Sequence, residues 1–524
     1  MNKKERFCDI DNIVEWRHII TALLALVTLA GQAQTYSELS DDWQNVQYAQ
    51  DETLPDVKIN KGIATIKVKL LGYKPDMKKE LYVLGFKPLG SKEQFEKEFP
   101  FADDGTLTAE IPVWMAREVR IGIGGITYPN EDMAFPSIII APGQKTEILM
   151  KVTDGQECPF VAFKGYMAKT NKDLQRAYDV FTTYRDDKKT YLKVKECKTK
   201  EERLQCLTEI FNQRISDVKG SNYTTAAKDL LCMEAERHFV EWTRNFANTY
   251  SRFVVLPDGK VTDWNDYYLE DCKKNRDMLS LSLEERDYSW KYLNEPTSPC
   301  SSAFWSANLL NYDKKAKEKN VHNIDLIILY SVLSRIYAGN VNFDNEGNAK
   351  CYGYIITSKD CSNVIREYQA EQQRIGQLLA SQESVFYQKY NDVPPEDILQ
   401  TILDKYKGKA VLIDMWETWC GPCRQGHKLM KPIKEEMSNI NVQFVYLASP
   451  KSQLNTWQEI IKDIEGDHYY LTEEQYNYIL GKYESDGIPT YAIYDAHGQL
   501  TFKNTGFPGI DCIKAEIEKA LNNK

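Results

Sequence analysis

Hydrophobic and polar residues alternate in several short segments between Tyr36 and Lys151. Strict alternation is typical of a β-strand with one buried and one solvated face. Turn-forming residues at Asp103-Asp104-Gly105 and Ala141-Pro142-Gly143 separate some of these segments. The pattern predicts a β-sandwich-like N-terminal domain, in which the last two segments form a closing hairpin. The predicted strands are Ile63–Leu71, Leu81–Phe86, Leu107–Val113, Val119–Ile123, Ser137–Ile140 and Thr146–Val152.

The pattern becomes helical between Tyr166 and Asn391, where long charged stretches follow one another. Pro394-Pro395 ends this region, because the residue before a proline is biased away from helical geometry. The pattern therefore predicts a mostly helical middle domain. Its expected helical stretches are Asn171–Val218, Thr225–Phe253, Ile324–Tyr337 and Asn363–Tyr390.

A third pattern, in which buried strands and helices alternate, fills the C-terminal part of the chain. The run Ala410–Trp416 is apolar almost throughout, as expected of a central strand that is covered on both faces. These segments predict an α/β domain. After a helix that ends near Ser438, the predicted elements are strand Val442–Ala448, helices Ser452–Ile464 and Glu473–Tyr483, strands Thr490–Tyr494 and Gln499–Lys503, and a helix from Asp511.

Composition limits the classes of function. The 524 residues are 42% hydrophobic and can form more than one core, so two to four domains are expected. A formal net charge of −10 argues against a nucleic-acid partner. The sequence has no glycine-rich phosphate loop, so no nucleotide chemistry is expected.

The motif Cys420-Gly421-Pro422-Cys423 carries the clearest chemistry. Two thiols three residues apart across the first turn of a helix can close a disulfide without moving the backbone. Cys420 is expected at the helix N-terminus, where unpaired N–H groups and the helix dipole stabilise a thiolate. We therefore expect Cys420 to be the nucleophile that forms a mixed disulfide, and Cys423 to resolve that intermediate.

A C-x-x-C motif by itself can also be half of a zinc site, which usually needs a second pair of cysteine or histidine ligands. The sequence contains no second C-x-x-C. His427 could supply one more ligand, but nothing near it in sequence completes a tetrahedron. No metal ion and no organic cofactor is therefore expected.

The dithiol motif, the apolar strand before it and Ile488-Pro489 make the segment from Pro395 to Lys524 resemble a thioredoxin-fold domain. It is most similar to the TlpA/ResA-like extracytoplasmic thiol-disulfide oxidoreductases. The resemblance implies a cis peptide bond before Pro489, which keeps a metal from capturing the dithiol, and a backbone at Ile488 that pairs with an extended substrate. It also implies that Asp414 lies under the active site and accepts the proton of Cys423.

Further site residues follow from the same resemblance. Trp416 is expected in the core and Trp419 at the rim of the substrate site. Gly506 begins the loop Gly506–Gly509, which matches a third loop that contacts the substrate in thioredoxin-like proteins.

The sequence departs from the family at two positions near the cysteines. Many TlpA/ResA-like proteins have a glutamate three residues after the second cysteine, where this chain has Gly426, so no second acid–base group is expected there. Glu417 occupies a position that is commonly small in thioredoxins; it could tune the thiol, but it is expected to face water. A peroxiredoxin would need a threonine at position 417 and a proline before it, so peroxidase activity is disfavoured.

The N-terminus predicts the compartment. Arg17-His18 precedes the apolar run Ile19–Ala30, and the small residues of Gly31-Gln32-Ala33 follow, which resembles a signal peptide cleaved before Gln34. The apolar run is too short for an ordinary transmembrane helix, so the mature chain is not expected to span a membrane. Acidic residues before the run leave two alternatives open, an uncleaved anchor or a later start of translation.

The predicted organisation is therefore a signal peptide at residues 1–33, a β-rich domain at 34–155, a helical domain at 156–393 and a catalytic thioredoxin-like domain at 394–524. We expect a periplasmic thiol-disulfide oxidoreductase that reduces or isomerises disulfide-containing protein substrates and receives electrons from a membrane donor. The alternative is a partner-binding scaffold with a non-catalytic thioredoxin-fold domain. Of the twelve cysteines, some should pair in an oxidising compartment, and Cys351 with Cys361 closes the shortest plausible loop in the helical region.

Overall fold

The computed structural model describes residues 43, 46–77, 80–86, 89, 95–123, 137–152, 160–178, 183–263, 265–281, 291–308, 322–337, 353, 355–437 and 440–523. The chain divides into two compact units: the first runs to Asn323 without Lys87–Gln94, and the second consists of Lys87–Gln94 and Ile324–Lys524. The predicted signal peptide, residues 1–33, lies outside the described residues. Within the described part of the chain, no helix combines the length and the apolar character that a membrane span requires.

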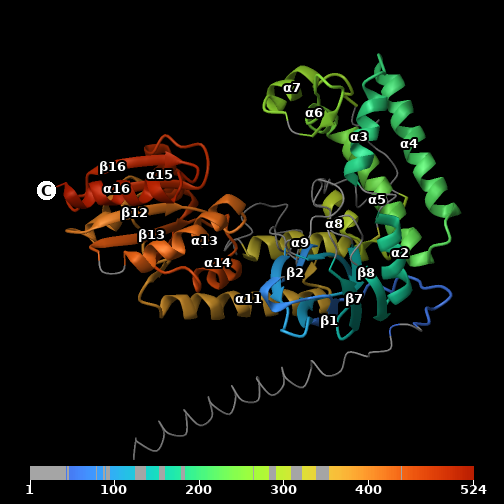
Figure 1. Cartoon of the computed structure of the whole chain (residues 1–524), viewed down its shortest axis with the longest axis horizontal. Helices are drawn as coiled ribbons and strands as arrows, with labels where there is room; N and C mark the ends of the chain where they lie inside the picture. Colours follow the sequence, from blue (N-terminus) through green and yellow to red (C-terminus); the bar gives the residue numbers. More distant parts are fainter. Residues whose placement is uncertain are drawn as a thin grey trace, which may run out of the picture. The chain divides into compact units, whose positions relative to one another are not determined.

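The first unit contains two four-stranded sheets (Figure 1). Every second residue of β1 from Ala64 to Leu70 is buried, so the alternation predicted for this strand is confirmed. Ile66 of one sheet and Ile121 of the other belong to the same hydrophobic core. The strands of the first sheet, in spatial order, are β4 (Thr106–Val113), β1 (Gly62–Leu71), β7 (Lys145–Lys151) and β8 (Phe160–Gly165). The strands of the second sheet, in spatial order, are β3 (Phe95–Pro100), β2 (Glu80–Phe86), β5 (Arg117–Ile123) and β6 (Ser137–Ile140).

The predicted closing hairpin is wrong, because β6 and β7 belong to different sheets. β6 pairs antiparallel with β5, whereas β7 pairs parallel with β1 and antiparallel with β8. The turn at residues 141–144 therefore carries the chain from one sheet to the other. Ile138 of β6 and Ile148 of β7 reach the same core. Their alternation indicated strands correctly, but it could not indicate which strands pair.

Helices follow the sheets in the first unit. The predicted stretch Asn171–Val218 is divided among three helices, and the third of them begins after a capping box in which Thr199 and Glu202 bond each other's backbone N–H groups. Trp242 and Phe211 belong to one hydrophobic core, to which the second and third of these helices also contribute Tyr191 and Leu207. The α-helices are α2 (Ala168–Tyr178), α3 (Thr183–Val194), α4 (Lys200–Gly220), α5 (Thr225–Arg244), α6 (Phe246–Ser251), α7 (Tyr268–Asn275) and α8 (Ser302–Asn308). A short hairpin is formed by β9 (Val254–Val255) and β10 (Val261–Thr262). Two 3-10 turns are η1 (Pro75–Met77) and η2 (Ser298–Cys300).

Two long helices of the predicted middle domain group with the C-terminal part of the chain, so the predicted limit at residue 393 does not coincide with the division into units. Ile375 of the second helix joins the core of the C-terminal domain. The predicted helical stretch Asn363–Tyr390 includes strand β11 (Val385–Tyr387), which pairs with a strand of that domain. The two helices are α9 (Ile324–Tyr337) and α11 (Lys359–Ala380).

A six-stranded mixed sheet forms the centre of the C-terminal domain. The first four strands in spatial order run parallel, and the last two pair antiparallel next to them. The order is β11, β14 (Asp467–Tyr470), β13 (Val442–Ala448), β12 (Ala410–Met415), β15 (Thr490–Tyr494) and β16 (Leu500–Thr505). The helices are α12 (Pro395–Asp404), α13 (Gly421–Glu436), α14 (Leu454–Ile461), α15 (Glu473–Lys482) and α16 (Ile510–Asn522).

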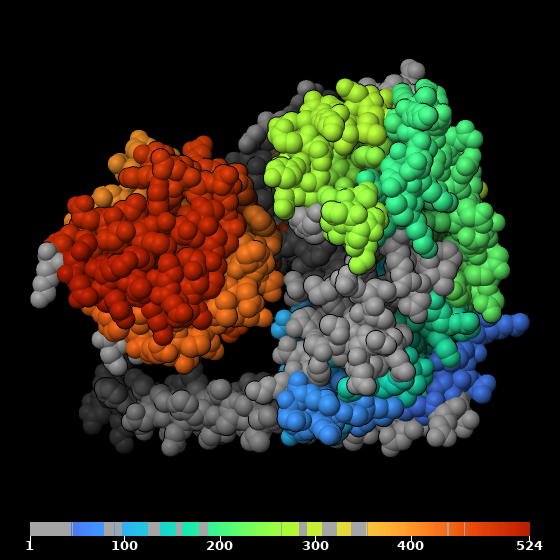
Figure 2. Space-filling model, turned by 45° about the horizontal axis from the view of Figure 1, so that its top comes forward, coloured from blue at the N-terminus to red at the C-terminus, as the bar shows by residue number. Residues whose placement is uncertain are grey.

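Strand β12 is buried along its whole length, as its continuous apolar run predicts. Leu412 belongs to a core that also contains Met430 of α13 and Ile513 of α16. The next residue, Ile413, belongs to a second core with Ile398 of α12. Successive side chains of β12 thus enter cores on opposite faces of the sheet. Figure 2 shows the domain, in orange and red, as one closely packed body.

Candidate functional site

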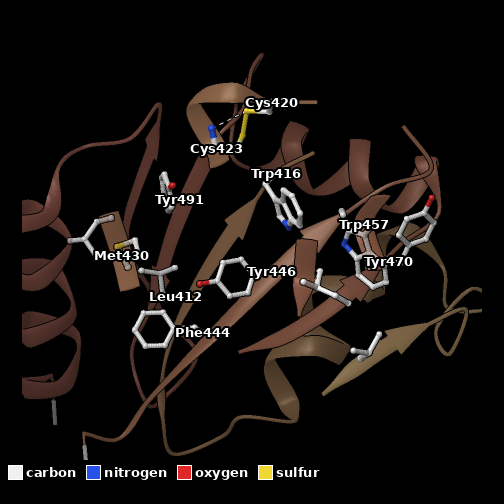
Figure 3. Packing of buried hydrophobic residues seen from close by; sticks show 14 of the residues in the cluster. Leu412, Trp416, Cys420, Cys423, Met430, Phe444, Tyr446, Trp457, Tyr470 and Tyr491 are labelled. Atoms are coloured by element: carbon white, nitrogen blue, oxygen red, sulfur yellow. Dashed lines mark hydrogen bonds between the residues drawn. A yellow bond between two sulfur atoms is a disulfide. The ribbon is translucent and has the colours of Figure 1, made fainter. Parts of the chain in front are cut away.

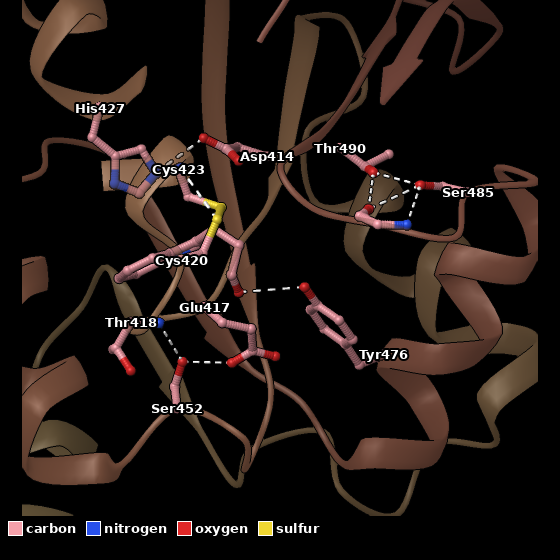
Figure 4. The surroundings of a disulfide bond; sticks show 12 residues. Asp414, Glu417, Thr418, Cys420, Cys423, His427, Ser452, Tyr476, Ser485 and Thr490 are labelled. Atoms are coloured by element: carbon pink, nitrogen blue, oxygen red, sulfur yellow. Dashed lines mark hydrogen bonds and ion pairs between the residues drawn. A yellow bond between two sulfur atoms is a disulfide. The ribbon is translucent and has the colours of Figure 1, made fainter. Parts of the chain in front are cut away.

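Cys420 and Cys423 form a disulfide at the start of α13, with 5.3 Å between their Cα atoms (Figure 4). Cys420 is the N-cap residue of the helix, and the Cys423 N–H group donates to the Cys420 Sγ atom at 3.2 Å. In the reduced protein, such a donor and the helix dipole would stabilise a Cys420 thiolate. Cys423 is fully buried, whereas Cys420 retains 4% of its exposure. Cys420, the more exposed of the two cysteines, is therefore the one expected to act as the nucleophile.

Two tryptophans flank the cysteines in opposite environments. Trp416 follows β12, is fully buried and belongs to the same core as both cysteines (Figure 3). Trp419 directly precedes Cys420 and is 55% exposed. The expectation of a core and a rim tryptophan is confirmed for their burial, whereas contact of Trp419 with a substrate stays a prediction.

Asp414 and His427 form a buried pair beside the disulfide. Asp414 lies in β12, and its Oδ2 atom is 3.1 Å from the His427 Nε2 atom. His427 lies one turn after Cys423 on the same face of α13, because residues four apart are neighbours on a helix. Figure 4 shows the three side chains next to one another. From the sequence, His427 was considered only as a metal ligand. Its four-residue spacing from Cys423 nevertheless indicated that the two side chains share one face of the helix.

The charge of Asp414 acts on two further buried side chains. Burial lowers the pKa of Lys434 to about 8, and the Asp414 charge opposes this shift. Burial and the same charge raise the pKa of Tyr491. Lys434 also donates to the Glu465 carbonyl oxygen at 2.6 Å. Asp414 is therefore part of a buried group of titratable side chains that extends from the disulfide into the core.

Close packing explains why position 426 is a glycine. A Cβ atom at this position would lie 2.6 Å from the Tyr491 Oη atom and 3.3 Å from the Phe507 ring. Because Tyr491 is fully buried, a glutamate at position 426 would have to displace it. The phenol of Tyr491 thus lies where a larger side chain on α13 would otherwise extend.

The expectation that Glu417 faces water is wrong, since this side chain is only 1% exposed. Its Oε1 atom accepts from the Ser449 hydroxyl and its Oε2 atom accepts from the Ser452 hydroxyl, both at 2.5 Å. Ser452 Oγ also accepts from the Thr418 N–H group at 2.8 Å (Figure 4). These contacts tie the loop before Cys420 to the connection between β13 and α14. The serines lie more than thirty residues later in the sequence, so no local pattern indicates them.

Glu417 should make the stability of the C-terminal domain depend on pH. Burial raises its pKa to about 7, while the two serine hydroxyls and the charge of Lys451 act in the opposite direction; Tyr476 on α15 also faces it. Because the pKa rises on folding, the stabilising contribution of protonated Glu417 is complete below the unfolded value of about 4.3 and is lost as pH rises to about 7. The expected loss is about 3 kcal/mol.

Hydrogen exchange of β12 and β13 peptides, corrected for the intrinsic pH dependence of exchange, measures this change in the full chain. The variant Glu417→Gln should lose this pH dependence and exceed the wild type in stability at pH 8. Glu474→Gln, which alters an exposed carboxylate on α15, should follow the wild-type profile. Equal pH profiles for the wild type and Glu417→Gln would contradict the assignment.

The predicted cis peptide bond before Pro489 is confirmed. Ile488 packs against the core that contains both cysteines. The Gly506 N–H group donates to the Pro489 carbonyl oxygen at 2.7 Å, and Gly506 has a φ of +86°, which favours glycine. The structure thus brings Pro489 and Gly506 together, while binding of a substrate by Ile488, Pro489 or Gly506 stays a prediction.

Comparisons with known proteins show similarity to a redoxin family, to thiol-disulfide oxidoreductases and to a thioredoxin. The Redoxin family model matches residues 392–521. The thiol-disulfide oxidoreductase ResA of Geobacillus kaustophilus is 25% identical over 124 residues, which are 23% of this chain and 66% of that protein. Chloroplastic thioredoxin Y2 of Arabidopsis thaliana is 28% identical over 129 residues, 25% of this chain and 59% of that protein. The chain thus spans less than two thirds of the length of either relative.

Among solved structures, the thioredoxin domain of a thiol-disulfide oxidoreductase from Bacteroides vulgatus is 21% identical, with a TM-score of 0.21 and coverage of 23% of this chain and 84% of that one. The sheet order, the dithiol at the start of α13 and the cis proline define the C-terminal domain as a thioredoxin-fold domain. With the Redoxin match and the relatives named thiol-disulfide oxidoreductase ResA, this is a TlpA/ResA-like domain of the thioredoxin superfamily.

Proposed function

We propose that this chain is an extracytoplasmic thiol-disulfide oxidoreductase that reduces or isomerises disulfides in proteins. The observation that carries the proposal is the pair Cys420 and Cys423 at the start of α13, with a backbone N–H group on the Cys420 sulfur. The names of the ResA relatives support the same class of activity. The segment that resembles a signal peptide supports a location outside the cytoplasm.

In the proposed reaction, the Cys420 thiolate attacks one sulfur of a substrate disulfide, and the other substrate sulfur leaves as a thiolate. Cys423 then loses its proton and attacks the Cys420 sulfur. This step breaks the mixed disulfide, releases the second substrate thiolate and forms the Cys420–Cys423 disulfide. Two electrons have passed to the substrate, so a membrane dithiol donor is proposed to restore the reduced pair.

Asp414 is proposed to accept the proton of Cys423, because its carboxylate is buried and lies beside this cysteine (Figure 4). The hydrogen bond from His427 would hold the carboxylate in position. Trp419, Ile488, Pro489 and Gly506 are proposed to contact the substrate. The two sheets of the first unit are proposed to form a sandwich-like domain that positions the chain or binds a partner.

The reduction potential of the Cys420–Cys423 pair tests the proposal. The full chain is equilibrated in glutathione or dithiothreitol buffers of defined ratio, and peptides with free Cys420 and Cys423 are counted by alkylation and mass spectrometry. The Gly-Pro dipeptide between the cysteines favours a potential near thioredoxin's value of about −270 mV. A potential near the value of about −120 mV for DsbA would reverse the direction to disulfide formation. A cysteine pair that the buffers neither reduce nor reoxidise would favour the alternative of a partner-binding scaffold.

A further inference from the structure

The two ring nitrogens of His427 lie in different surroundings. The Nε2 atom is 3.1 Å from the Asp414 Oδ2 atom. The Nδ1 atom is buried and has no hydrogen-bond partner among the residues that the structure describes. Because an ionised carboxylate accepts hydrogen bonds and cannot donate one, the Nε2 atom must carry the proton whenever Asp414 is charged. The site therefore selects the Nε2–H tautomer of the neutral imidazole.

Two aromatic rings fix the orientation of this imidazole. The centre of the His427 ring is 4.8 Å from that of Trp416 and 5.4 Å from that of Tyr446, with angles of 80° and 87° between the ring planes. Trp416 directly follows β12, and Tyr446 lies opposite Asp414 where β13 pairs with β12. Since all of these side chains are buried, the imidazole cannot turn away from Asp414 without disturbing the core.

The same surroundings disfavour a second proton on the imidazole. The Nδ1–H group of an imidazolium would be buried without an acceptor, which is costly. Lys434, two turns after His427 on the same face of α13, places its Nζ atom 4.5 Å from the centre of the Tyr446 ring that His427 also contacts. An imidazolium would therefore add a second positive charge near this ammonium group. His427 is suited to donate a hydrogen bond and not to take up a proton.

We infer that His427 is a positioning residue for the resolving step, in which its neutral Nε2–H group binds Asp414 Oδ2 and leaves Oδ1 to take the proton of Cys423. The Oδ1 atom is buried, and no described residue forms a hydrogen bond with it. This role rests on the proposed function and deepens it, because it assigns His427 to one step and to one protonation state.

The resolving step then balances as follows. The S–H bond of Cys423 breaks, and its proton passes to Asp414 Oδ1. The Cys423 sulfur attacks the Cys420 sulfur, and the electron pair of the mixed disulfide leaves with the substrate thiolate. His427 keeps its own proton throughout. Without this donor, the carboxylate loses a hydrogen bond that stabilises its charged form and fixes its orientation, so the resolving step should be slower.

Three substitutions of His427 separate a hydrogen-bond donor from a base and from a packing residue. The amide nitrogen of His427→Gln can occupy the place of Nε2 and donate to Asp414, but it cannot take up a proton. The shorter side chain of His427→Asn places its amide near the Nδ1 position, and His427→Leu has no donor. Resolution should slow by no more than about 3-fold in His427→Gln and by about 10-fold or more in the other two variants.

A rapid acid quench measures both steps in the full chain. The reduced protein is mixed with oxidised glutathione, quenched at successive times, alkylated and digested with trypsin. The peptide of residues 410–424 carries both Cys420 and Cys423, and mass spectrometry shows it as the dithiol, the glutathione adduct or the internal disulfide. Formation of the adduct reports the first attack, and its decay reports resolution. The pair Cys351 and Cys361 considered from the sequence is not tested, because Cys351 lies outside the described residues.

The matched control is His497→Gln, which alters an exposed histidine in the turn before β16 and should leave both rates at their wild-type values. The variants of His427 should change only the decay of the adduct, because Asp414 takes no part in the first attack. Formation of the adduct at the wild-type rate also shows that a variant has folded. If His427→Leu does not fold, the comparison of His427→Gln with His427→Asn still decides the result.

Three results would overturn the inference, and they point to different errors. If His427→Gln resolves the adduct as slowly as His427→Asn, the imidazole acts as a base. If His427→Asn resolves it as fast as the wild type while Asp414→Asn is slow, His427 has no part in the step and the proposed function stands. If Cys423→Ser forms no adduct at all, the proposed function fails and the role of His427 fails with it.

Discussion

The substitution Cys420→Ser should lower the rate of protein disulfide reduction by at least about 1,000-fold, because a serine hydroxyl does not replace a thiolate as the attacking group. The assay is the reduction of a disulfide-bonded protein by the full chain, with dithiothreitol as the electron donor. Cys512→Ser, which removes a half-buried cysteine in α16, is the control and should retain the wild-type rate. Activity that survives in Cys420→Ser would show that another group is the nucleophile.

The variant Cys423→Ser should instead accumulate a covalent complex with the substrate, since Cys420 can attack but nothing resolves the intermediate. Non-reducing electrophoresis detects this complex, and dithiothreitol should reduce its disulfide and separate the two proteins. Asp414→Asn should prolong the same complex in a chain that retains both cysteines, because the amide cannot accept the proton of Cys423. If Asp414→Asn slows the first attack and leaves the release step unchanged, the proposed role of Asp414 is wrong.

Trp416→Ala should lower the free energy of unfolding of the C-terminal domain by about 3–5 kcal/mol. The indole is fully buried in the core beneath the cysteines, so its removal leaves a cavity next to Cys423 and His427 (Figure 3). The measurement is the urea concentration at which β12 and β13 peptides lose protection from hydrogen exchange. Trp416→Phe keeps an aromatic ring in the same place and should lose less stability, which keeps the comparison possible if the alanine variant does not fold.

Trp419→Ala is the matched control for this prediction, because the second indole is 55% exposed and only three residues away. It should change the stability of the domain by no more than about 0.5 kcal/mol. It should nevertheless weaken the reaction with protein substrates, seen as a higher KM at nearly unchanged kcat, if Trp419 contacts the substrate as proposed. Equal stability losses in Trp416→Ala and Trp419→Ala would contradict the assigned environments.

Local patterns predicted the C-terminal domain well because its signals lie close together in the sequence. The apolar run that became β12, the first turn of α13 and Ile488-Pro489 each carry their information within a few residues. Strand β14 was missed, since its four residues Asp467–Tyr470 are flanked by helices and mixed in polarity. It forms because the edge of β13 offers a parallel partner, which no window of the sequence contains.

For Glu417 and His427, too, the local sequence indicates less than the contacts between distant segments decide. A carboxylate before the motif reads as a solvated charge when only its neighbours in sequence are considered. Ser449 and Ser452 directly follow β13 in the chain, and the parallel pairing of β12 with β13 brings them to Glu417. His427 could be placed near Cys423 by helical spacing alone, but its partner Asp414 lies on another element.

The sequence by itself indicated the pair Cys420 and Cys423, the proline Pro489 and the elements that hold them, because helix spacing, apolar runs and proline positions act over short distances along the chain. Only the tertiary structure decided the burial of Glu417, the pairing of Asp414 with His427 and the separation of β6 from β7 into two sheets. Burial and hydrogen bonding depend on which distant segments pack together, and those contacts in turn set the pKa values and the reactivity of the side chains.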